Sequence, residues 1–238
     1  MRLLRVVVII GVVLGALFTG ADRWAVGYAE DRLAERLRAR QGPTGTTDVR
    51  IHGFPFLTQA LSRDLERVDL TLTGVETTAG GRKTRISRID AGFHGVALDA
   101  DYSGGTARRA EGSGLIGYAD LAEALQSDAA FAYGGAPGKV KVTATVNVRG
   151  ASLTRSVVAT VSLVDAPGTK GGKTVRVRAD SVPGEGIPGV ENLVRKKTDF
   201  DRDLGGGLPA GLTLSALTSD ETGVRLVLGG TDVSLAGS

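Results

Sequence analysis

The chain has 238 residues, of which 42% are hydrophobic and only 5% aromatic, and it contains no cysteine. The missing thiols exclude disulfides, thiol catalysis and thiolate metal sites. The formal charge is +3, and Arg2 and Arg5 of the N-terminal segment are two of the 29 basic residues, against 26 acidic ones. The rest of the chain is therefore close to neutral, which argues against a nucleic-acid-binding protein.

An apolar run from Val6 to Phe18 follows the two arginines. It is shorter than the ~20 residues of a comfortable membrane span and has the length of a signal-peptide core. Thr19-Gly20-Ala21 supplies small residues for cleavage after the alanine. The alternative is an uncleaved anchor, in which Trp24 and Tyr28 lie at the membrane interface. Either way we expect an exported protein, with a signal peptide or anchor at 1–21 and one domain at 22–238.

The next segments predict one amphipathic helix followed mainly by strands. From Val26 to Arg40, apolar residues recur at helical spacing and charged residues fill the other positions. Most of the remaining chain alternates between apolar and polar residues, which is typical of antiparallel strands with one buried and one solvent-exposed face. The clearest alternating runs are Val68–Thr73, Val140–Arg149, Val175–Arg178 and Val224–Leu228.

Several other segments interrupt this pattern. The stretch from Arg82 to Tyr102 predicts one bent strand or a hairpin, broken near Gly92 or Gly95. Helical patterns and a turn-rich connector also occur. The helices are expected at Tyr118–Gln126 and Pro188–Lys197, and Gly134–Gly138 is a candidate boundary between two halves.

Partial motifs for catalysis or ligand binding lack the context that their chemistry needs. Gly184–Gly189 matches G-x-G-x-x-G, but the alternating strands around it do not form a parallel βαβ unit. Asp199–Asp203 has the spacing of a calcium loop without its glycine and glutamate, so we expect a solvated acidic turn. The only histidines, His52 and His94, belong to no catalytic motif, and Gly112-Ser113-Gly114 lacks the flanks of a nucleophile elbow. We expect no catalytic residue, no bound metal and no cofactor.

The most distinctive local segment is Ile51–Gln59, which joins a strand to a short helical turn ending near Leu61. Gly53 frees its backbone and Pro55 stiffens it, with a phenylalanine on either side of the proline. Such a segment fits either a corner of the hydrophobic core or an apolar lip or floor of a ligand cavity. The residues alone leave both interpretations open.

This segment resembles the signature of the LmeA-like phospholipid-binding family of actinobacterial cell envelopes. The C-terminal patterns Leu208–Leu212, Gly223–Leu226 and Gly229–Val233 agree with that resemblance. It implies an α+β fold in which long curved antiparallel strands wrap around helices, similar to tubular lipid-binding domains. It also implies an exported protein that works at the membrane surface, in a periplasm-like space or on the outer face of the plasma membrane. Its expected partners are phospholipid, phosphoinositide or glycolipid.

On this basis we expect a non-catalytic carrier that holds acyl chains in an apolar cavity. The helix end Arg195-Lys196-Lys197 is either a solvated turn or a contact for anionic head groups. One alternative is an envelope enzyme that acts on lipid-linked glycans through Asp120, Glu123 or His94. Another is a structural envelope protein. The residues expected to contact acyl chains are Phe54, Pro55, Phe56, Leu57, Leu61, Leu121, Leu125, Leu193 and Val194.

Overall fold

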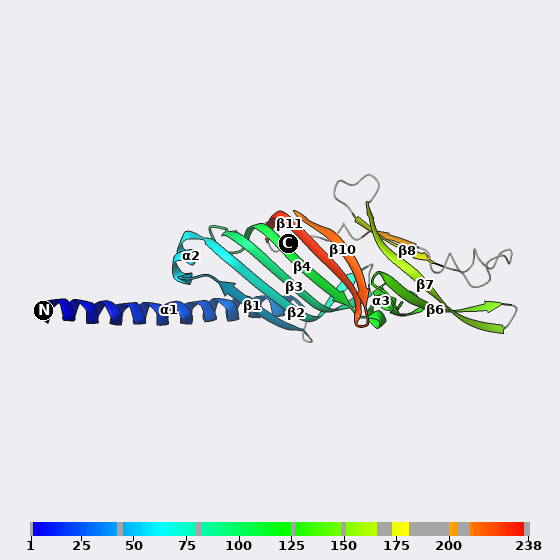
Figure 1. Cartoon of the computed structure of the whole chain (residues 1–238), viewed down its shortest axis with the longest axis horizontal. Helices are drawn as coiled ribbons and strands as arrows, with labels where there is room; N and C mark the ends of the chain where they lie inside the picture. Colours follow the sequence, from blue (N-terminus) through cyan, green and yellow to red (C-terminus); the bar gives the residue numbers. More distant parts are fainter. Residues whose placement is uncertain are drawn as a thin grey trace.

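Two antiparallel sheets and a long N-terminal helix make up the described part of the chain (Figure 1). The computed structural model describes residues 2–41, 45–79, 82–124, 127–148, 151–165, 173–180, 200–203 and 210–235. The helices are α1 (Arg2–Gln41), α2 (Phe56–Ser62) and α3 (Tyr118–Ala124). The strands are β1 (Thr46–His52), β2 (Asp64–Ala79), β3 (Arg82–Leu98), β4 (Gly105–Ile116), β5 (Ala130–Tyr133), β6 (Lys139–Val148), β7 (Ala151–Asp165), β8 (Lys173–Ala179), β9 (Phe200–Asp203), β10 (Leu212–Asp220) and β11 (Gly223–Ser234).

The two sheets are open. The main sheet has the strand order β1-β2-β3-β4-β11-β10, and the second sheet has the order β5-β6-β7-β8-β9. Every pair of neighbouring strands is antiparallel, and β3 runs for 17 residues. This confirms the predicted α+β fold of long antiparallel strands and helices. The last two strands of the chain return to the main sheet, so sequence order and spatial order differ.

The apolar run and the predicted amphipathic helix form one continuous helix, α1 (Figure 1). Its residues 9–18 are exposed, whereas Val26 and Ala34 are buried beside the main sheet. The second half of α1 also covers the edge of β1, because the Glu30 carboxylate accepts a hydrogen bond from Ile51 N (2.7 Å) and Arg38 donates one to Thr47 O (2.8 Å). By length and composition, residues 9–39 could cross a membrane, a property that signal sequences share.

The segment that predicted a bent strand or a hairpin is one strand, β3. Gly95 has a φ of +58°, which favours glycine, and the pair Glu66–Gly95 is missing from the β2–β3 ladder. Phe93 and Val96 on either side of it pack into the same core, although residues three apart on a regular strand face opposite sides. The irregularity at Gly95 therefore turns the last part of the strand back onto the core.

Two hydrophobic cores lie at different parts of the main sheet. The first is built from α1, α2 and the strands β1 to β4, and it includes Val26, Val49, Phe56, Val68 and Val96. The second joins the second sheet to β10 and β11, and it includes Val140, Val142, Val177, Leu214 and Val224. Hydrogen bonds reinforce the second junction, because Ser219 Oγ donates to Lys139 O (2.8 Å) and Tyr118 OH donates to Asp220 O (2.6 Å).

Two predictions about the chain's organisation are wrong. The glycine-rich connector Gly134–Gly138 joins β5 to β6 inside the second sheet, so it does not separate two halves. The expected acidic turn is largely strand, because Phe200–Asp203 pairs with β8 as β9 and backbone pairing prevails over local polarity. The expected helix Pro188–Lys197 lies outside the described residues.

Candidate functional site

The two faces of the main sheet have opposite chemistry. The strand register places Val49, Leu70, Ala91, Gly112 and Leu228 side by side across five strands. Because successive side chains of a strand point to opposite faces, the residues next to them point the other way. Those neighbours form a row on the second face that is mostly charged: Arg50, Asp69, Gly92, Glu111 and Gly229. One face is therefore apolar and the other polar, as the alternation predicts.

The middle of the apolar face is lined by unusually small residues, Ala91, Ala110, Gly112 and Gly114, which we call the apolar strip. Gly114 is buried, yet a Cβ atom added to it would meet no atom of the described residues within 4 Å. Within the described part of the chain, space therefore remains above this residue. It is space on an apolar surface, since the neighbouring strands contribute mainly aliphatic side chains to this face.

Larger apolar side chains flank the strip on both sides. Leu70 and Phe93 pack against the first core, whereas Leu226 and Leu228 pack against the second. The strip, which consists of alanine and glycine, thus lies between the two cores. A long apolar ligand would meet a continuous aliphatic surface here without displacing a well-packed core residue.

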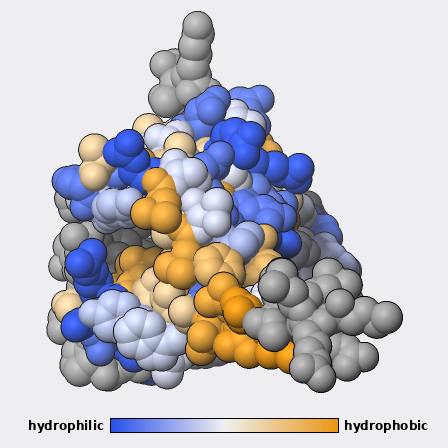
Figure 2. Space-filling view, turned by 90° about the vertical axis from the view of Figure 1, so that its left-hand side faces the viewer, coloured by the Kyte–Doolittle hydropathy of each residue, from blue (hydrophilic) through white to orange (hydrophobic). Residues whose placement is uncertain are grey.

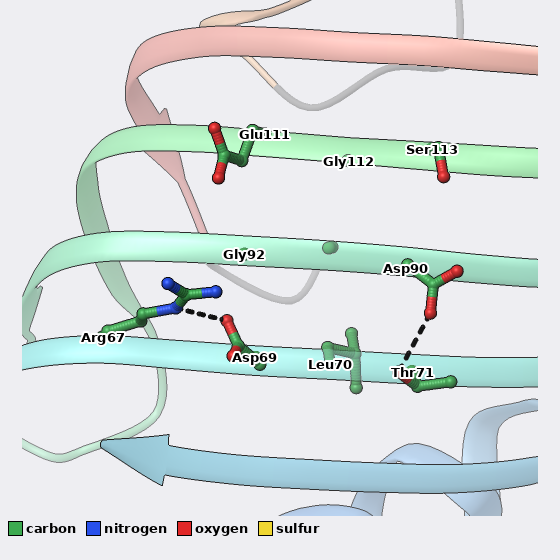
Figure 3. A pocket seen from close by; sticks show the side chains of 10 residues that line it. Arg67, Asp69, Leu70, Thr71, Asp90, Gly92, Glu111, Gly112 and Ser113 are labelled. Carbon is green, nitrogen blue, oxygen red and sulfur yellow. Dashed lines mark hydrogen bonds and ion pairs between the residues drawn. The ribbon is translucent and has the colours of Figure 1, made fainter.

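The polar face carries a hollow of about 350 Å³ (Figure 3). Gly92 leaves room in its floor, and carboxylates from three neighbouring strands surround it. Arg67 Nε donates to Asp69 Oδ1 (2.8 Å), and Thr71 Oγ1 donates to Asp90 Oδ1 (3.1 Å). This lining is polar, so it does not provide the apolar cavity that we expect for acyl chains.

The carboxylates around the polar hollow form ion pairs with arginine side chains of their own strands. Arg88 donates to both oxygens of Asp90 (2.7 and 2.8 Å), and these hydrogen bonds lower the pKa of Asp90 below its ordinary value of 3.8, although partial burial opposes the shift. The Asp69 carboxylate also lies 2.8 Å from His52 Nε2. Among the described residues, no group of three acidic or histidine side chains is arranged to hold a metal ion.

Because Asp90 forms an ion pair with Arg88, we expect the folded protein to become less stable at acidic pH. A carboxyl group with a lowered pKa in the folded state stabilises the protein above pH 3.8, and this contribution is lost as the pH falls through the folded-state value. We expect the thermal unfolding midpoint to drop between about pH 6 and about pH 3. Asp90→Asn should drop less over the same interval, because its side chain does not titrate. An equal drop in both proteins, measured by circular dichroism, would contradict this assignment.

The segment around Pro55 forms a corner in which one phenylalanine is buried and the other is exposed. Phe56 is buried at 8% exposure in the first core, whereas Phe54 is 59% exposed and Leu61, at the end of α2, is 81% exposed. Pro55 and Leu57 are half-buried. The two interpretations of this segment therefore apply to different residues: Phe56 is a core corner, and Phe54 and Leu61 are an outer apolar surface.

The remaining residues predicted to bind lipid do not gather at this corner. Leu121 lies on α3, at the opposite end of the main sheet from α2, and packs against the second core (Figure 1). Other members of the predicted site lie outside the described residues. These are Leu125, Leu193 and Val194, together with the predicted head-group contacts Arg195, Lys196 and Lys197.

The residues of the enzyme alternative also lie apart. His94 Nε2 is 3.5 Å from Glu111 Oε1 on the polar face. Asp120, by contrast, is at the α3 end, where its carboxylate and the hydroxyl of Ser87 both approach Gly117. Ser87 and His94 are seven residues apart on β3, or about 23 Å along the strand. Asp120 and His94 therefore do not converge on one cleft.

Sequence reasoning missed the apolar strip. Its signal is the recurrence of small residues at Ala110, Gly112 and Gly114, every second position of β4. These residues are too small to produce a clear hydrophobic alternation, and their Gly-Ser-Gly portion resembles a nucleophile elbow that lacks its flanks. Only pairing with β3 and β11 shows that they share the apolar face.

Together these features define an open-sheet α+β protein with an extended apolar face and an apolar N-terminal helix. The chain belongs to the LmeA-like phospholipid-binding family, whose model matches residues 20–228. This match confirms the resemblance carried by the segment around Pro55, and it covers the second half of α1 and both sheets as far as the middle of β11. No curated protein and no solved structure matches the chain. The family is one of lipid-binding proteins and is not a known enzyme family.

Proposed function

We propose that this protein is an exported, non-catalytic binder or carrier of phospholipids that holds acyl chains against the apolar strip. Family membership supports the class of ligand. The observation that carries the proposed location is the buried Gly114, which has free space above it on an otherwise aliphatic face.

The physical requirement is a continuous apolar surface. Burying a methylene group contributes about 0.8 kcal/mol, so an acyl chain of about sixteen carbons needs on the order of 13 kcal/mol of apolar contact to leave a membrane. The 12 residues of β4 extend over roughly 40 Å, more than the ~30 Å hydrocarbon core of a whole bilayer. The apolar face is thus long enough for one or more acyl chains laid along the strands.

The same proposal includes attachment to the membrane through α1. The exposed apolar residues 9–18 support this, because a helix surface of this kind needs a lipid or protein environment. The small residues of the predicted cleavage site, Thr19-Gly20-Ala21, lie inside the continuous helix. That position favours a retained anchor over a cleaved signal peptide. The head group that is recognised stays a prediction, with Arg195, Lys196 and Lys197 as the expected contacts.

The proposal is tested by extracting lipid from the purified full-length protein. We expect mass spectrometry to find phospholipid retained after exchange into a detergent that carries no phospholipid. Delipidated protein should take phospholipid up again from vesicles of phosphatidylcholine and phosphatidylglycerol. Protein that is free of lipid and takes up none from these vesicles would overturn the proposal.

A further inference from the structure

We propose that the corner formed by Phe54–Leu61 is seated in the interfacial region of the lipid bilayer from which α1 emerges. The inference rests on the membrane attachment proposed above, and it goes further by assigning a membrane-contacting surface to a part of the folded domain. We call this surface the α2 corner: Phe54 to Leu61, with Tyr102 beside it.

Two contacts hold the α2 corner at the level where α1 would leave the membrane. The carboxylate of Asp22 is fully buried and accepts a hydrogen bond from Leu57 N (2.8 Å). One residue further along α1, the guanidinium of Arg23 lies 5.5 Å from the ring centre of Phe54. Since these partners are fixed to residues 22 and 23, the depth of the helix in a bilayer also sets the depth of α2.

The composition of α1 places residues 22 and 23 at the membrane boundary. The 19 residues from Leu3 to Ala21 carry only one charge, that of Arg5 near the N-terminus, and they extend over about 28 Å as a helix. This length matches the ~30 Å hydrocarbon core of a bilayer. Trp24 and Tyr28 follow, with ring centres 5.8 Å apart, and such aromatic residues prefer the head-group region.

The α2 corner presents the apolar surface that this position requires. Leu61, Phe54 and Tyr102 are all exposed, and the Tyr102 hydroxyl connects its loop to α2 by donating a hydrogen bond to Ala60 O (3.1 Å). In the view onto this end of the molecule, apolar side chains continue from α1 upward as one orange band bordered by hydrophilic surface (Figure 2). Because this band adjoins the apolar part of α1, a bilayer around the helix would cover it.

The α2 corner and the apolar strip lie near one another along the same strands. The strands β2, β3 and β4 all have one end beside α2, and Val96 and Ala107 at those ends are buried apolar residues. The strip begins at Ala110, three residues further along β4. The α2 corner and the strip are therefore neighbours along the same apolar face of the main sheet, with the first core between them.

The depth of Leu61 in a bilayer tests the inference. The chain has no cysteine, so Leu61→Cys and Glu221→Cys each provide a single site for a nitroxide spin label in the full-length protein. Glu221 is the matched control, because it is exposed in the β10–β11 turn at the opposite end of the main sheet. Both proteins are reconstituted into vesicles of phosphatidylcholine and phosphatidylglycerol in equal parts, and collisions with oxygen and with a water-soluble nickel chelate are measured.

We expect the nickel chelate to reach the label at residue 61 at most half as well as the label at residue 221, with the opposite order for oxygen. Equal access of the chelate to both sites would overturn the inference. Lipid extracted from the same samples separates this failure from that of the proposed function. Retained phospholipid together with a water-exposed residue 61 would leave the carrier function standing and remove only the membrane contact.

Discussion

A leucine at position 114 should remove most of the bound phospholipid. Gly114 lies in the apolar strip, and a Cβ atom there meets no described atom within 4 Å, so the first carbon of the new side chain has room. It would then occupy the space proposed for an acyl chain. Its four carbons exclude about four methylene contacts, about 3 kcal/mol, so we expect affinity for phospholipid to fall on the order of 100-fold.

The matched control for Gly114→Leu is Ser113→Leu. Ser113 is the preceding residue of β4 and faces the polar hollow on the opposite side of the sheet (Figure 3). For both variants, lipid uptake from vesicles of phosphatidylcholine and phosphatidylglycerol is measured. Circular dichroism checks that both variants are folded. Equal loss of lipid in the two variants would show that bound acyl chains do not lie on the apolar strip.

The second large effect is expected when the buried carboxylate of Asp22 is removed. The helix α2 has Pro55 as its N-cap and no side-chain cap of its own, so Asp22 of α1 provides the acceptor for Leu57 N. In Asp22→Ala this half-buried amide loses its partner, and the loss of an acceptor at the N-terminus of a helix is destabilising. We expect hydrogen exchange of the α2 amides to accelerate on the order of tenfold or more.

Two variants of α1 control for this result. Asp31→Ala removes an exposed carboxylate from the same helix and should leave exchange in α2 unchanged. Asp22→Asn keeps an oxygen that can accept from Leu57 N and should recover part of the protection. Exchange is measured by mass spectrometry on the full-length proteins in detergent. If Asp22→Ala and Asp31→Ala behave alike, the carboxylate of Asp22 does not hold the corner.

Much of the fold can be predicted from local patterns of residues in the sequence. The alternating runs around Val68, Val140, Val175 and Val224 all lie in strands, because period-2 alternation matches a sheet with one buried face. The short helix before Leu61 and the helix beginning at Tyr118 are also confirmed. These elements depend on neighbouring residues, so the order of amino acids is sufficient to predict them.

Other features depend on contacts between residues far apart in the chain. The strand β4 shows no clear alternation, because its apolar face is made of alanine and glycine, and it becomes a strand by pairing with β3 and β11. The separate roles of Phe54 and Phe56 follow from the way α2 packs against α1 and the main sheet. No local pattern distinguishes these two phenylalanines.

By itself, the sequence determined the apolar N-terminal helix, the antiparallel strand character and the resemblance to a phospholipid-binding family, since each depends on short stretches of residues. Only the tertiary structure decided where an apolar surface with free space lies. That space exists because Ala91, Ala110, Gly112 and Gly114 meet on one face between two cores. It also decided that Asp22 joins α1 to α2, since a hydrogen bond between residues 35 positions apart requires the folded chain.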